Sequence, residues 1–100
     1  MEKENRLKLY KEAVELWGVN AQVDMVFEEC GELVAVLAKD RRGRAEVQDI
    51  LTELADVSIM CEQIGALLGY EDFEAEKERK LERLKKRLEE SKRERNGKGA

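Results

Sequence analysis

Acidic side chains recur three residues apart in two segments of this chain. Glu29 and Glu32 form the first pair, and Glu53 and Asp56 form the second. Residues at this spacing lie on one face of a helix, about one turn apart. Like charges there repel, and partial burial raises the cost of ionising them. A divalent cation between the two segments would remove both penalties, and an all-oxygen ligand set favours magnesium or manganese over zinc or iron.

Apolar neighbours distinguish these pairs from ordinary surface charge. Met25 and Val36 accompany the first pair, and Met60 and Leu67 accompany the second. However, a chain with 23 acidic residues in 100 contains about five such pairs by chance for this composition. A solvated acidic face therefore stays open as the alternative for each pair.

Helical spacing of apolar residues predicts the elements that would position the two pairs. We expect four helices, over about residues 3–17, 21–39 and 44–68 and from about 72 onward. Gly18 and Gly69 are expected to end the first and third helices, and Asn20 and Asp72 to cap the second and fourth. Each middle helix also has a broad apolar face, which includes Phe27, Cys30 and Val34 in one and Leu51, Leu54 and Cys61 in the other.

The composition favours an all-α fold and excludes several kinds of site. The chain has no proline and no histidine, so Ser-His-Asp and Cys-His catalysis and histidine-containing di-iron sites are excluded. Its two cysteines form no C-x-x-C motif and are expected to be small buried hydrophobes. A 100-residue helical chain usually completes its core with copies of itself, so we expect a homodimer or homotetramer.

Charge and hydropathy indicate the cellular location of the protein and the classes of partner it could bind. No apolar run reaches the roughly 20 residues that span a bilayer, and the first residues lack the apolar core of a signal peptide. We therefore expect a soluble, cytoplasmic protein without a membrane partner. The net charge is −4, and acidic and basic residues are interspersed along most of the chain. This distribution does not favour binding of nucleic acid. We expect one helical domain over 1–90 and a disordered charged tail over 91–100, whose basic residues alternate with glutamates and have no aromatic neighbour for base stacking.

The acidic pairs belong to a longer pattern that resembles a known family. Glu28-Glu29-Cys30-Gly31-Glu32, followed by Glu53-Leu54-Ala55-Asp56, resembles the E-E-x-x-E and E-x-x-D signature of MazG-like proteins. Trp17-Gly18 and Gln22 resemble that family's lead-in to the signature. The resemblance covers about residues 17–63, and together the two halves of the motif are fairly specific.

This resemblance implies an all-α, four-helix MazG-like bundle that is completed by homo-oligomerisation. It implies a magnesium-dependent pyrophosphohydrolase that cleaves a nucleoside triphosphate, ribo- or deoxy-, to the monophosphate and pyrophosphate. Manganese could replace magnesium. By similarity, the metal ligands would be Glu29, Glu32, Glu53 and Asp56. Glu28 would orient a water from nearby, or it is a surface residue. Either Glu28 or Glu53 could take the proton of the attacking water, and the sequence does not choose between them.

Basic and aromatic residues supply candidates for substrate binding. Lys39 lies two turns beyond Glu32 and could reach a phosphate. Lys80 and Arg87 stand where MazG-like proteins often place basic residues near phosphates, although Leu84 replaces the polar residue usual between them. A solvated helix is the alternative for this segment. Gln22 could bind a base edge and Trp17 could stack on it, or both are structural.

Two further readings of the whole chain stay open. The first is a non-catalytic, self-associating helical bundle whose acidic pairs are surface features or bind an ion structurally. The second is an enzyme restricted to one substrate, such as dUTP, dCTP or phosphoribosyl-ATP. No feature of the sequence selects among these substrates or identifies a broad role against non-standard nucleotides.

Overall fold

The structure, a computed structural model, describes residues 1–98 and is entirely helical over that range, with no strand. Three helices follow one another: α1 (Lys3–Trp17), α2 (Val19–Arg41) and α3 (Val47–Lys98). This confirms the all-α prediction. No helix among the described residues combines the length and apolarity needed to cross a membrane.

Glycines mark the breaks between helical segments. Gly18 ends α1 with a φ of 88°, and its N–H donates to the carbonyl oxygen of Val14 at 2.8 Å. A side chain would be strained at this φ, whereas glycine adopts it freely. The prediction that Asn20 caps the second helix is wrong, because α2 already begins at Val19 and has no side-chain cap.

The long helix α3 contains a second break. Gly69 has φ 138° and ψ 102°, which is not helical, so α3 consists of two helical stretches. This break is where we expected one helix to end and another to begin. The chain correspondingly divides into a first unit, Met1–Leu68, and a second unit that begins at Gly69.

The second unit stays helical further than expected. We predicted a disordered tail from residue 91, but α3 continues to Lys98. Proline is absent, and the abundant lysine, arginine and glutamate of this segment are good helix formers. Ion pairs such as Lys77–Glu74, at 2.6 Å and one turn apart, add to the helix stability earlier in this unit. Residues 99 and 100 of the predicted tail lie outside the described residues.

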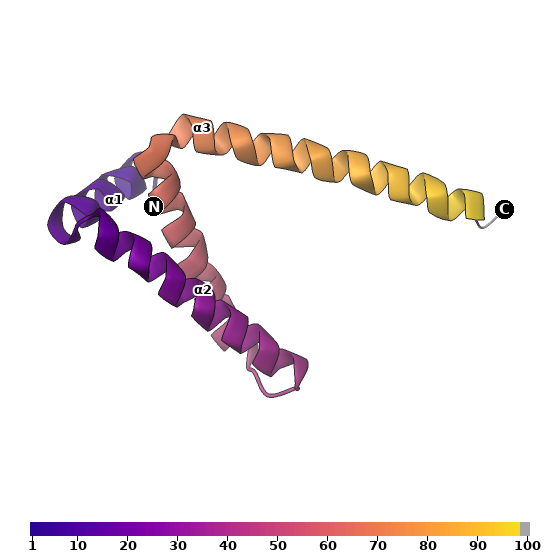
Figure 1. The fold of residues 1–100 in the computed structure, drawn as a ribbon, viewed down its shortest axis with the longest axis horizontal. Helices are drawn as coiled ribbons and strands as arrows, with labels where there is room; N and C mark the ends of the chain where they lie inside the picture. Colours follow the sequence, from indigo (N-terminus) through magenta and orange to yellow (C-terminus); the bar gives the residue numbers. More distant parts are fainter. Residues whose placement is uncertain (99–100) are drawn as a thin grey trace. The chain divides into compact units, whose positions relative to one another are not determined.

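Within the first unit, α2 and the first stretch of α3 form a helical hairpin joined by the loop 42–46 (Figure 1). The loop turns at Gly43, which has a φ of 70°. Among the described residues, the buried hydrophobic side chains are only Tyr10 and Met60, and the buried polar ones are Gln22 and Gln63. The single chain therefore has a thin core.

The two hairpin helices do not pack through the faces that their composition suggests. The stripes that contain the acidic residues turn inward, since Glu29, Glu53 and Asp56 are half-buried and Met60 is buried. The broad apolar faces are largely exposed: Phe27 is 73% exposed and Val34 68%. Cys61, expected to be buried, is also exposed, while Cys30 is half-buried.

Candidate functional site

Three acidic side chains from the two hairpin helices meet in one cluster. Glu29 comes from α2, and Glu53 and Asp56 come from α3. One carboxylate oxygen from each lies within 4.8 Å of the others, and all three residues are half-buried. The i, i+3 spacing in α3 places Glu53 and Asp56 on one face, as expected, and the packing of the hairpin places Glu29 opposite them.

Glu32 lies at the edge of this cluster. It is exposed, yet its charge is close enough to raise the pKa of both Glu29 and Glu53. All four of the predicted ligands therefore belong to one electrostatic neighbourhood. Glu28, on the same helix, is exposed and is not part of the three-residue cluster.

Ionisation of the carboxyl groups in this cluster is unfavourable, because they are partly buried and close to one another. Partial burial is the main cause that raises the pKa of Glu29 above its usual value. The negative charges of Glu32, Asp56 and Glu53 raise this pKa further. Partial burial is also the main cause that raises the pKa of Glu53. The negative charges of Glu32, Asp56 and Asp49 raise it further. No cation stands among these causes, so the carboxylates repel one another with little compensation.

Two oxygens in the cluster lack partners. Oε2 of Glu29 and Oε2 of Glu53 are buried and have no hydrogen-bond partner among the described residues. A buried acceptor without a partner destabilises a fold. These orphaned oxygens, together with a ligand set made only of carboxylates, fit a hard divalent cation such as magnesium or manganese.

A buried amide pair continues the same inter-helix stripe. Gln63 donates a hydrogen bond from Nε2 to Oε1 of Gln22, and each residue is only 5% exposed. Gln22 lies two turns before Glu29 in α2, and Gln63 lies two turns after Asp56 in α3. Gln22, for which binding of a base edge and a structural role were both open, therefore has its amide oxygen engaged by Gln63. Sequence reasoning missed Gln63, although its seven-residue distance from Asp56 places it on the acidic stripe.

A second polar contact ties α1 to α3. Oε1 of Glu62 accepts hydrogen bonds from Nε of Arg6 at 2.6 Å and from the hydroxyl of Tyr10 at 3.1 Å. Burial raises the pKa of Tyr10, and the hydrogen bond to Glu62 raises it further. Sequence reasoning also missed this network, because neither periodicity nor spacing relates residues so far apart in the chain.

The remaining candidates for substrate binding are exposed. Trp17, at the end of α1, is 63% exposed, so it is not the core tryptophan of the structural alternative. Lys39 is exposed near the end of α2, and Lys80 and Arg87 are exposed on the second unit. These four side chains are therefore accessible, and within the first unit neither Trp17 nor Lys39 belongs to the acidic cluster.

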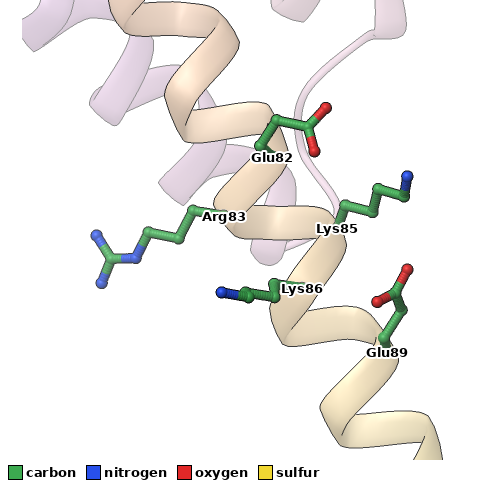
Figure 2. A pocket seen from close by; sticks show the side chains of 5 residues that line it. All are labelled: Glu82, Arg83, Lys85, Lys86 and Glu89. Atoms are coloured by element: carbon green, nitrogen blue, oxygen red, sulfur yellow. The ribbon is translucent and has the colours of Figure 1, made fainter.

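A surface hollow on the second unit is not an enclosed site. It is lined by Glu82, Arg83, Lys85, Lys86 and Glu89, all from one helix. Figure 2 shows Arg83 and Lys86 pointing to one side of this helix, and Glu82, Lys85 and Glu89 pointing to the other. Because the side chains diverge, they do not converge on a ligand.

Comparisons with protein-family models, with curated proteins and with solved structures find no match for this chain.

Proposed function

We propose that this protein is a magnesium-dependent nucleoside triphosphate pyrophosphohydrolase. The observation that carries the proposal is the half-buried cluster of Glu29, Glu53 and Asp56, whose oxygens lie within 4.8 Å of one another. It contains three of the four residues that the resemblance to MazG-like proteins implies as metal ligands. Manganese is a possible substitute.

The chemistry of phosphoanhydride cleavage suits these residues. Such reactions depend mainly on positioning and on neutralising the charge of phosphate oxygens. A bound divalent cation would supply that neutralisation and lower the pKa of a water molecule. Glu29, Glu53 and Asp56, with Glu32 at the edge, would hold the cation. The raised pKa of Glu53 also suits a group that accepts a proton, and the exposed Glu28 is the alternative base.

The apolar faces left exposed support self-association as part of this proposal. Phe27, Val34, Leu51 and Leu54 are all at least 46% exposed in the single chain. Covering such side chains contributes about 1.5–3 kcal/mol each when burial is complete. A homodimer or homotetramer would bury these faces and complete the bundle. Phe27→Ser should then lower the mass observed by light scattering.

The direct test is product analysis. The purified protein is incubated with ribo- and deoxynucleoside triphosphates and magnesium, with Glu53→Gln as the matched control. We expect monophosphate and pyrophosphate with the wild type alone. Diphosphate and phosphate would contradict the proposed cleavage site, and equal activity of Glu53→Gln would contradict the assigned residues.

A non-catalytic, self-associating bundle is the second candidate function. The observation that favours it is the same exposure of apolar side chains beside a thin core, which calls for a partner whether or not the chain is an enzyme. This candidate predicts no thermal shift with any triphosphate in the presence of magnesium. A shift with one triphosphate and none with others would exclude it.

A further inference from the structure

The second unit carries three exposed leucines on one side of its helix. Leu81, Leu84 and Leu88 are each at least half exposed. Their spacing of three and four residues aligns them on one stripe. Anchors at i, i+3 and i+7 are the pattern by which an amphipathic helix docks on a protein surface.

The charge around this stripe is predominantly basic. At about 100° per residue, the lysines Lys80, Lys85 and Lys92 lie beside the leucines. Glu82 and Glu89 lie on the same side as Lys85 but further from the leucines (Figure 2), and Glu90 lies on the far side of the helix. Residues 77–98 contain eleven basic and five acidic residues, a net charge of +6. Two such basic stripes would repel each other, so the pattern disfavours pairing with an identical stripe and favours an acidic apolar partner.

The first unit has the complementary character. Residues 1–68 contain eight basic and fourteen acidic residues, a net charge of −6. On α2, Phe27 and Val34 are exposed and two turns apart, as Leu81 and Leu88 are. Gly31 lies between them, and a Cβ built there meets nothing within 4 Å. The exposed carboxylates of Asp24 and Glu28 flank this surface.

We propose that the leucine stripe of one copy docks antiparallel on the Phe27–Val34 face of α2 in a second copy. In this register Leu84 lies over Gly31, where no side chain obstructs it, while Leu81 and Leu88 pack near Val34 and Phe27. The same register brings Lys85 near Glu28 and Lys92 near Asp24 of the other copy. Leucine burial supplies affinity, and the two charge pairs select the orientation.

This inference rests on the self-association proposed above but not on catalysis. The test therefore uses mass, measured by analytical ultracentrifugation of the full chain at several concentrations. One variant combines Lys85→Glu with Lys92→Glu, and another combines Asp24→Lys with Glu28→Lys. The matched control combines Lys86→Glu with Arg93→Glu, which makes the same charge change on the far side of the helix.

We expect each of the two interface variants to self-associate at least about tenfold more weakly, because two attractive pairs become repulsive. An equimolar mixture of the two should associate again, since each reversed face then meets its complement. The control should match the wild type. Carbodiimide treatment of mixed ¹⁴N- and ¹⁵N-labelled wild type should join Lys92 to Asp24 across copies.

Several outcomes would overturn the inference. A wild type that stays monomeric would remove both the docking and the proposed self-association. Interface variants that associate like the control would leave self-association standing but assign it to other faces. A mixture that stays monomeric would exclude pairing between copies. The wild type could instead bind anionic vesicles or an oligonucleotide. If the variant that combines Lys85→Glu with Lys92→Glu abolishes this binding and leaves the mass unchanged, the leucine stripe belongs to a site for that anion.

Discussion

Gln63 donates a hydrogen bond to Gln22 across the α2–α3 hairpin, and the two side chains are the most deeply buried polar groups among the described residues. The pair is two turns from the acidic cluster on both helices. It therefore sets the register in which Glu29 meets Glu53 and Asp56.

Removing one partner of this pair should destabilise the fold. Gln63→Ala leaves the buried amide of Gln22 unpaired, and we expect a loss of about 1–3 kcal/mol in the free energy of unfolding. Urea denaturation followed by circular dichroism measures it, with the exposed Gln48→Ala as the control. Replacing both residues with leucine should cost less than Gln63→Ala alone, because no buried polar group is then left without a partner. A double variant that is much less stable than the single one would contradict this account.

The acidic cluster should be necessary for turnover but not for folding. We expect Glu53→Gln or Asp56→Asn to lower the rate of triphosphate cleavage at least about a hundredfold, the low end for a group acting in acid–base or electrostatic catalysis. Circular dichroism should show the same helicity as the wild type. The exposed Asp40→Asn, outside the cluster, is the matched control. Full activity of either cluster variant would remove these residues from the site.

The stability of the metal-free protein should depend on pH in a defined direction. The pKa values of Glu29 and Glu53 are raised above 4.5 in the folded chain, by burial first and then by neighbouring carboxylates. The folded state therefore keeps protons that the unfolded state has already lost, and stability falls as the pH rises from about 4.5 through the raised values. Thermal unfolding in chelator checks this, and Glu53→Gln should flatten the profile. A stability that rises through this window would contradict the assigned repulsion.

Magnesium should restore, at neutral pH, the folding stability that the metal-free protein loses as the pH rises. A ligand that binds only the folded state stabilises it by about 2.7 kcal/mol at a hundredfold excess over its Kd. We expect the melting temperature to rise with magnesium for the wild type and to stay constant for Glu53→Gln. Sodium chloride at matched ionic strength is the control, since screening alone would relieve part of the repulsion. An equal rise in both proteins would indicate a cation effect away from the cluster.

The hydroxyl of Tyr10 should hold α1 against α3. Tyr10→Phe removes only the donor to Glu62, and we expect a loss of about 0.5–1.5 kcal/mol in unfolding free energy. The same substitution made in a Glu62→Ala background should cost clearly less, because the acceptor is already absent. Equal costs in both backgrounds would show that the hydroxyl acts elsewhere.

Much of the local structure follows from the sequence alone. Apolar periodicity predicts the helices, and Gly18 and Gly69 break them where expected, because only glycine adopts their φ values without strain. Helical spacing also places Glu53 beside Asp56. These features depend on neighbours a few residues away, so a single sequence contains the information for them.

Only the tertiary structure decides which helix faces meet. Periodicity identifies two stripes on α2 and α3, but it does not tell which one turns toward the other helix. In the single chain the acidic stripe turns inward and Phe27 and Val34 face outward, contrary to what hydrophobicity alone suggests. The contacts of Gln63 with Gln22 and of Tyr10 with Glu62 join residues 41 and 52 positions apart. Such contacts depend on how whole helices pack, and no local pattern encodes that packing.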